Sequence, residues 1–266
     1  MEVIYQKEGY IDEAMNLIFS NADGDILITT DDDAIPSKNW VEDHVKIHNK
    51  YSELGVAGPI ISNWKSKISI IKKIYSIIME KPLDERMRDY TTYFANTGIF
   101  VSNPLYKLAN LHYIKSFSFM GVNMSAKREV YKDFRLLPMT LRGIGYEQYL
   151  CLHSFRKGFI SANFMDCCKI YHEERDSLSR PKSLNGIKER YAEMMLSVYY
   201  LSRFYKINLS KLKIDIKLKT FSWELHKKSE IEKAMLEGIK IGLKISLEAI
   251  QNNYDHKWIR EKLKEI

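Results

Sequence analysis

The stretch 25–36 places the strongest constraint on what this chain can fold into. Residues 26–30 (Ile-Leu-Ile-Thr-Thr) are apolar or β-branched over the length of one strand, which predicts a strand buried in a sheet. This run ends in three consecutive carboxylates (31–33), and Pro36 and Ser37 then predict the start of a helix. Because open α/β sheets bind ligands at the carboxyl ends of their strands, the stretch predicts an α/β fold with a binding site at this turn.

The three aspartates of this turn would repel one another unless a cation lies among them. Side chains alternate along an extended backbone, so Asp31 and Asp33 share one side while Asp32 faces the other. This spacing predicts a site in which Asp31 and Asp33 hold one hard metal ion. The alternative is a solvated acidic turn without a ligand.

Composition narrows the class of protein. With 266 residues, 45% of them hydrophobic, the chain can bury the core of one large domain with a helical appendage. The 3 cysteines include the adjacent pair Cys167 and Cys168, which is no disulfide framework and indicates a reducing compartment. We find neither a signal-peptide pattern nor an apolar run of roughly eighteen residues, and we therefore expect a cytoplasmic protein. The net charge of +7 indicates an anionic partner, whether membrane, nucleic acid or sugar-phosphate.

Residues 64–90 have a different character from their surroundings. Apolar side chains form one stripe of a predicted helix, with lysines beside it; the stripe is Ile71, Ile74, Tyr75 and Ile78, and the lysines are Lys65, Lys67, Lys72, Lys73 and Lys81. This pattern is typical of a helix that lies on an anionic bilayer, so we expect the protein to be peripheral on the inner face of a membrane. A helix packed on its own domain is the alternative.

Three blocks of the sequence resemble the family 2 glycosyltransferases, which have the GT-A fold. The first combines an "A-x-N" helix (14–16), "A-x-G-D" (22–25) and an Asp-x-Asp metal motif (31–33). The second, Gly-Val-Asn-Met-Ser-Ala-Lys-Arg (121–128), resembles the acceptor-side loop of that family. The third, Gly-Tyr-Glu-Gln-Tyr (145–149), is similar to the start of its catalytic helix and is followed by Gly158.

The resemblance implies roles for the residues at the matching positions. Glu147 would be the catalytic base, since the family places its catalytic carboxylate 11 residues before the glycine that ends the helix. A carboxylate in the first turn of a helix is favoured by the helix dipole as well, whatever its function. Asp31 and Asp33 would hold Mn²⁺ or Mg²⁺. His172, at the end of a segment that resembles the final strand of the family's sheet, would be a third metal ligand, or else a structural histidine.

Donor binding would involve four residues, of which Asp31 is one. Asn16 corresponds to a family residue near the nucleotide-sugar, although helix capping or packing explains an asparagine there as well. Asn123 could hydrogen-bond a sugar or hold its own turn, and Arg128 could reach a phosphate or a carboxylate. Tyr146 and His153 depart from the family pattern, at positions where Glu and Arg are common, which affects the expected acceptor contacts.

The resemblance thus predicts an inverting, metal-dependent transfer of a sugar from a nucleotide diphosphate sugar to a hydroxyl of a glycan or lipid-linked acceptor. The alternative is a non-catalytic or half-enzyme relative that acts as a glycan- or membrane-binding module. A nucleic-acid binder is a third class, but we find no nucleic-acid motif and expect no nucleic-acid partner.

The expected architecture is a GT-A-like core over residues 1–182, with a mixed sheet flanked by helices, and a helical C-terminal extension over 183–266. Family members begin with further nucleotide-binding strands, whereas only 30 residues precede Asp31 here, with one short strand expected over residues 1–5. We therefore expect the C-terminal part of a longer or split glycosyltransferase. An upstream polypeptide or a second copy of the chain would then complete the sheet at its open edge.

Overall fold

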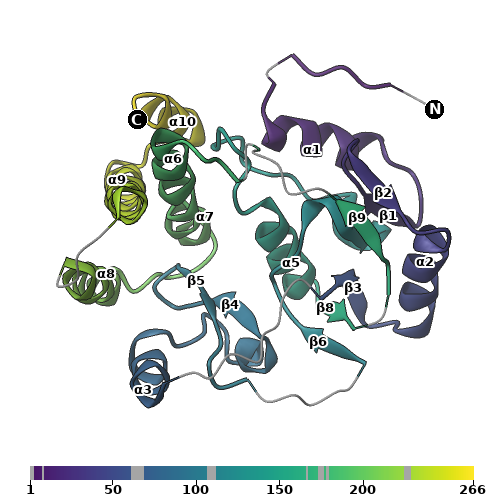
Figure 1. Cartoon of the computed structure of the whole chain (residues 1–266), viewed down its shortest axis with the longest axis horizontal. Helices are drawn as coiled ribbons and strands as arrows, with labels where there is room; N and C mark the ends of the chain where they lie inside the picture. Colours follow the sequence, from purple (N-terminus) through teal and green to yellow (C-terminus); the bar gives the residue numbers. More distant parts are fainter. Residues whose placement is uncertain are drawn as a thin grey trace.

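The computed structural model of the chain describes residues 3–7, 9–60, 69–106, 112–165, 167–172, 177, 180–224 and 229–266, with side chains omitted over 222–224. Its centre is a five-stranded mixed sheet with helices on both faces, and a group of helices from the C-terminal part of the chain lies beside it (Figure 1). The predicted α/β class, a mixed sheet flanked by helices, is confirmed.

The central sheet has the strand order β1-β7-β3-β8-β6. β7 runs antiparallel to both β1 and β3, β3 runs parallel to β8, and β6 runs antiparallel to β8. β1 therefore ends the sheet on one side, as an edge strand among the described residues. The strands are β1 (Ile26–Thr29), β3 (Leu54–Pro59), β6 (Tyr113–Lys115), β7 (Met124–Lys127) and β8 (Ile160–Phe164).

Each face of the sheet carries its own core. Val56 points into the larger core and the next residue, Ala57, into the smaller one, as alternation along a strand requires. Trp40 and Ile47 of α2 cover the smaller core. The larger core lies under α1, α4 and α5. These helices are α1 (Ile11–Asn21), α2 (Trp40–Lys50), α4 (Arg128–Tyr131) and α5 (Tyr146–Arg156).

The chain forms a strand where the sequence predicted the start of a helix. β2 (Ala34–Pro36) pairs antiparallel with β9 (Ile170–His172), and this pairing takes Pro36 and Ser37 out of the helix. The helix begins at Trp40 with Asn39 at its N-cap, so the prediction of a cap at Ser37 was wrong. Proline is tolerated at the edge of such a two-stranded ribbon, where its missing N–H costs no ladder bond.

The short strand expected over residues 1–5 is absent from its described residues, 3–5. β4 (Thr92–Phe94) and β5 (Phe100–Ser102) pair in a hairpin. Gly98, with φ of +85°, occupies the turn of this hairpin, a conformation that glycine adopts at low cost.

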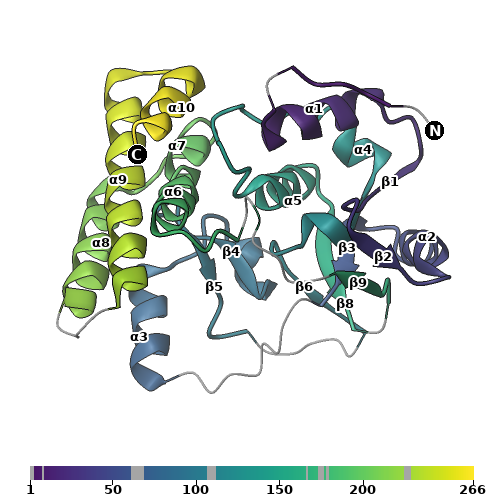
Figure 2. The ribbon, with the colours of Figure 1, turned by 45° about the horizontal axis from the view of Figure 1, so that its top comes forward.

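The C-terminal helices pack as a layer against the rest of the chain (Figure 2). The larger core continues through them, since Leu196, Leu243 and Ile259 belong to the same buried cluster as Phe19 and Leu150. The helices are α6 (Leu184–Met194), α7 (Ser197–Ser202), α8 (Leu209–Glu224), α9 (Glu230–Asn252) and α10 (His256–Lys264). The division at residue 182 stays a prediction.

The remaining elements connect these layers. They are α3 (Ile70–Met79) and the short 3₁₀ helices η1 (Glu85–Asp89) and η2 (Gly121–Asn123). Within the described part of the chain, every helix is too short or too polar to cross a bilayer.

Candidate active site

The turn after β1 and the end of β9 bring Asp31, Asp33 and His172 together. Ala34 lies opposite His172 in the pairing of β2 with β9, and this register places the imidazole beside the turn. The Nε2 atom of His172 lies 3.1 Å from a carboxylate oxygen of Asp33 and 3.8 Å from one of Asp31. Asp32 is exposed and is not part of this cluster, as the predicted alternation requires.

The chemistry and spacing of this cluster fit a hard divalent cation. One donor atom from each side chain can be chosen so that all three lie within 4.8 Å of one another. Oxygen ligands bind such ions at about 2.0–2.6 Å, so a single ion can reach donors at these separations. Partial burial raises the pKa of Asp31, as do the neighbouring carboxylates of Asp33 and Asp32. A cation at this position would relieve that repulsion.

Arg180 places a guanidinium next to this cluster. One of its terminal nitrogens lies 3.4 Å from Nδ1 of His172, and its charge acts to lower the pKa of Asp31. A guanidinium beside two carboxylates and an imidazole suits a diphosphate group, because its planar fork matches phosphate oxygens. The sequence analysis did not single out Arg180.

Glu147 lies in the first turn of α5, partly buried and within electrostatic reach of Asp31. Burial raises the pKa of its carboxyl to about 7, and the negative charge of Asp31 adds to this rise. The backbone N–H groups of Glu147 and Gly121 oppose it. A carboxyl with this pKa can accept a proton near neutral pH, which is what a general base must do.

The short helix η2 joins the two halves of the site. The hydroxyl of Thr29, at the end of β1, donates a hydrogen bond of 2.5 Å to the carbonyl oxygen of Gly121. A Cβ atom at position 121 would lie 1.4 Å from the hydroxyl oxygen of Tyr146, so only glycine fits there. Gly145, with φ of +100°, precedes the helix and turns the chain into it. These contacts place Glu147 beside the carboxyl end of β1.

Asn123 is buried, and its side-chain amide is already engaged at both ends. Its oxygen accepts a hydrogen bond of 2.9 Å from the indole of Trp40 and lies 3.1 Å from Nε2 of His44. Its nitrogen donates to the carbonyl oxygen of Cys168, at 2.6 Å. Asn123 thereby connects η2 and α2 to the segment that leads into β9. In this arrangement the amide supports the site and has no free end for a sugar.

Two other predicted donor-binding residues also contact protein groups. The amide of Asn16 pairs with the backbone of Leu136, donating at 3.0 Å and accepting at 2.8 Å. Arg128 donates to the carbonyl oxygen of Asp23, and a second guanidinium nitrogen lies 3.7 Å from its carboxylate. The structure therefore brings together Asp31, Asp33, His172 and Glu147, and it gives Asn16 and Arg128 partners elsewhere.

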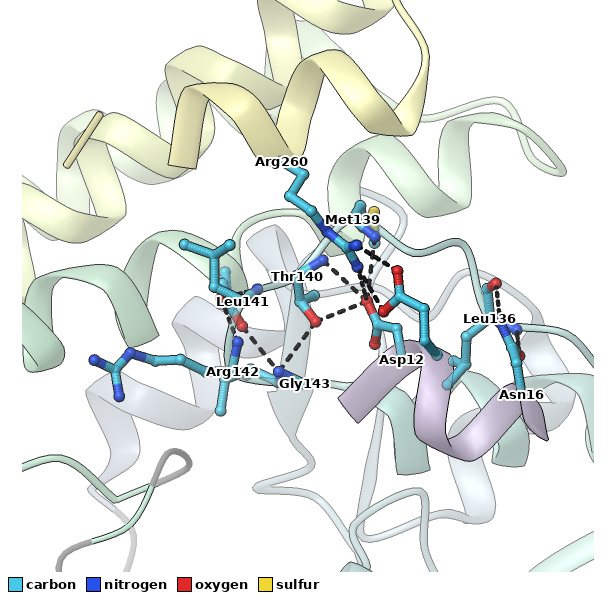
Figure 3. Close-up of polar contacts among 12 residues, drawn as sticks. Asp12, Asn16, Leu136, Met139, Thr140, Leu141, Arg142, Gly143 and Arg260 are labelled. Atoms are coloured by element: carbon cyan, nitrogen blue, oxygen red, sulfur yellow. Dashed lines mark hydrogen bonds and ion pairs between the residues drawn. The ribbon is translucent and has the colours of Figure 1, made fainter. Parts of the chain in front are cut away.

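Buried carboxylates hold the loop that leads into α5 (Figure 3). Asp12 of α1 accepts hydrogen bonds from the backbone N–H of Met139, at 3.1 Å, and from both the N–H and the hydroxyl of Thr140, at 2.9 and 2.7 Å. Arg260 of α10 lies 3.7 Å from the Asp12 carboxylate and also pairs with Glu13. The loop thus takes its backbone partners from distant helices.

Glu193 of α6 holds the second part of the same loop. Its carboxylate accepts the backbone N–H groups of Leu141, Arg142 and Ile144, at 2.7, 2.9 and 3.2 Å. Burial raises its pKa to about 7, against the effect of these donors. A buried irregular segment must find partners for its N–H groups, and Asp12 and Glu193 supply them. Neither residue was predicted from the sequence, because a carboxylate that binds distant backbone has no local pattern.

A comparison with protein families gives the chain its affiliation. Residues 1–131 match the model of the family described as "Glycosyl transferase family 2". The match includes β1, the aspartate turn and η2, whereas Glu147 and His172 lie beyond it. No curated protein matched the chain. The match covers just under half of the chain and, taken with the mixed sheet flanked by helices, supports a family 2 glycosyltransferase.

Proposed function

We propose that this protein is a metal-dependent, inverting glycosyltransferase that moves a sugar from a nucleotide diphosphate sugar to a hydroxyl of a glycan or lipid-linked acceptor. One observation carries this proposal. A three-residue cluster suited to a cation, Asp31, Asp33 and His172, lies beside a carboxyl with a pKa of about 7, that of Glu147.

The donor side of the site is the turn after β1. Asp31, Asp33 and His172 hold Mn²⁺ or Mg²⁺, and Arg180 contacts an oxygen of the donor diphosphate. The bound ion supplies positive charge against the charge that grows on the leaving diphosphate. The exposure of Asp31 and Asp33 leaves the cluster open to a ligand from solvent.

The acceptor side is the start of α5. Glu147 accepts the proton of the attacking hydroxyl, and a positioned base of this kind typically contributes ~10²- to 10⁴-fold to the rate. If attack and departure occur on opposite sides of the sugar, the anomeric configuration inverts. The raised pKa and the nearness of Glu147 to Asp31 support this assignment.

The open edge of β1 is the place for a further polypeptide. One side of its backbone has no strand partner among the described residues, and such edges can pair with another chain. We propose that a strand of an upstream polypeptide or of a second copy pairs there. Sedimentation analysis of the chain alone, and with such a polypeptide added, tests this idea.

The proposed activity is tested by incubating the protein with a panel of UDP- and GDP-sugars and glycan or polyprenyl-phosphate acceptors, with and without Mn²⁺. We expect metal-dependent release of nucleotide with at least one donor, and a product whose anomeric configuration is opposite to that of the donor. A product of retained configuration would contradict inversion. Metal-independent glycan binding without turnover would favour the non-catalytic alternative.

A further inference from the structure

The helices α3 and α8 lie side by side at the end of the molecule remote from β2 and β9 (Figures 1 and 2). Buried polar groups fix their contact. The hydroxyl of Tyr75 donates to the carboxylate of Asp215, and the ammonium of Lys219 lies 3.1 Å from Asp215 and 3.1 Å from Glu80. The two helices therefore hold one orientation relative to each other.

α3 turns its most apolar face away from the protein. Ser76 and Met79 are buried on its inner side, next to Tyr75. The opposite side carries all five isoleucines of the helix, each between 52% and 80% exposed: Ile70, Ile71, Ile74, Ile77 and Ile78. A helix that served only to pack on its own domain would turn these side chains inward. The exposure of the isoleucines favours the predicted bilayer-facing helix over a helix packed on its own domain.

α8 extends this apolar surface. Ile214, Leu218 and Phe221 are 54%, 48% and 62% exposed and are spaced so that they share one side of the helix. Leu212 and Ile216 are buried on the other side. We call the eight exposed side chains of α3 and α8 the apolar surface.

Exposed lysines lie beside the apolar surface, whereas the carboxylates of Asp215 and Glu80 are buried. Lys72 and Lys73 of α3 and Lys213 and Lys217 of α8 are exposed. Asp215 and Glu80 are buried and paired with Lys219. Among the described side chains of α3 and α8, the accessible charge is therefore positive.

We propose that the apolar surface docks the protein on an anionic phospholipid bilayer. Isoleucine, leucine and phenylalanine side chains enter the boundary between headgroups and acyl chains, and the four lysines contact anionic headgroups. A second copy of the chain is a poorer partner, because a symmetric contact through this surface would place lysines against lysines. Docking does not depend on the proposed transferase activity and can be measured without donor or metal.

The test is co-sedimentation with vesicles of phosphatidylglycerol and phosphatidylcholine, compared with vesicles of phosphatidylcholine alone. We expect binding to the anionic vesicles at low salt and release at high salt, since salt screens the lysines. The double variants Ile71→Gln/Ile74→Gln and Lys213→Gln/Lys217→Gln should each bind at least tenfold more weakly. For the lysine pair, the expected loss is about 30-fold, which corresponds to about 1 kcal/mol for each lysine.

The matched control is Val41→Gln/Val45→Gln on α2, which removes two exposed apolar side chains at the other end of the molecule. This variant should bind vesicles as the wild type does. If the wild type does not bind anionic vesicles at low salt, the proposal is wrong. It is also wrong if the wild type does not bind vesicles but forms a dimer that the α3 variant converts to a monomer.

A labelled variant keeps the test informative if a glutamine variant fails to fold. An environment-sensitive dye on Ile74→Cys should shift its emission to the blue on anionic vesicles, whereas the same dye on Val41→Cys should not. Equal spectra with and without vesicles at position 74 would contradict docking through α3.

Discussion

At the scale of single residues, Glu147 has the surroundings that a general base needs at neutral pH. Its carboxyl is partly buried at the start of α5, and burial together with the charge of Asp31 raises its pKa to about 7. The base works only when it is deprotonated. Activity should therefore be complete above this pKa and be lost as the pH falls through it.

We predict that kcat/KM falls about tenfold for each pH unit below about 7 in the free enzyme. Glu147→Gln should lose turnover, and its remaining activity should no longer depend on pH in this range. Donor affinity should be kept, because the amide retains the shape of the side chain without its basicity. The measurement is the pH profile of nucleotide release, with donor affinity measured in parallel. Loss of donor binding in the variant would show that Glu147 holds the site together instead.

Arg180 offers a second test at this scale. Arg180→Ala should weaken the binding of UDP or GDP by roughly 10- to 100-fold, since a hydrogen bond to a charged group is worth about 1.5–3 kcal/mol. Binding of Mn²⁺ alone should change little. The matched control is Arg88→Ala, which removes an exposed arginine paired with Glu85. Equal nucleotide affinity in both variants would remove Arg180 from the proposed site.

The sequence predicted the parts of the site that follow local rules. The alternation of Asp31 and Asp33 follows such a rule, and both carboxylates lie in one cluster. The place of His172, 139 residues from Asp33, was expected only from the family resemblance. Arg180, Asp12 and Glu193 could not be found in this way, because their partners are 8, 127 or 128, and 49 to 52 residues away along the chain. A buried carboxylate that accepts backbone N–H groups leaves no periodic signal.

At the scale of elements, the loop over 136–144 determines where α5 begins, although it has no sequence pattern that predicts this. It has no regular structure of its own, and α1 and α6 satisfy its backbone N–H groups through Asp12 and Glu193. Arg260 of α10 lies 3.7 Å from the Asp12 carboxylate. Since the loop leads directly into α5, these contacts fix the start of the helix that carries Glu147. If Glu147 is the base, we infer that Glu193 positions it.

We predict that Glu193→Ala lowers the free energy of unfolding by at least about 3 kcal/mol, because it leaves three buried N–H groups without partners, at about 1–3 kcal/mol each. The variant should also lose kcat with little change in donor affinity. Thermal unfolding and kinetics test this prediction. The control is Glu237→Ala, because Glu237 is exposed and its single ion pair, 3.6 Å from Lys188, should contribute little to stability. A loss of stability with full kcat would make Glu193 a structural residue only.

The predicted boundaries of helices and strands were wrong where pairing between distant segments determines them. Pro36 was predicted to open a helix, but β9 offers residues 34–36 a strand partner, and α2 starts only at Trp40. Long periodic segments were predicted more closely. The region 183–266, which was expected to be helical, forms α6 to α10.

At the scale of the whole molecule, the C-terminal helices are joined to the core through a close helix contact. Gly238 and Gly242 of α9 face α6, and a Cβ atom at these positions would lie 2.2 Å from the carbonyl oxygen of Lys188 and 2.0 Å from that of Ala192. The two backbones touch here, so larger residues would force the helices apart.

We predict that Gly242→Ala destabilises the protein by about 1–3 kcal/mol, despite the higher helix propensity of alanine. The melting temperature should fall by about 2–4 °C for each kcal/mol in a chain of this size. Lys244→Ala, at an exposed position two residues away, is the control and should be close to neutral. A Gly242→Ala variant as stable as the wild type would mean that α9 can shift without cost.

We propose that Asp31, Asp33 and His172 form a metal-dependent site for a nucleotide diphosphate. The most direct measurement is titration calorimetry of UDP and GDP with and without Mn²⁺, on the wild type, Asp33→Asn and Asp32→Asn. We predict that the wild type and Asp32→Asn bind one of the nucleotides only when Mn²⁺ is present, and that Asp33→Asn does not bind it although it stays folded. Nucleotide binding that is unaffected by Mn²⁺ or by Asp33→Asn would contradict the claim.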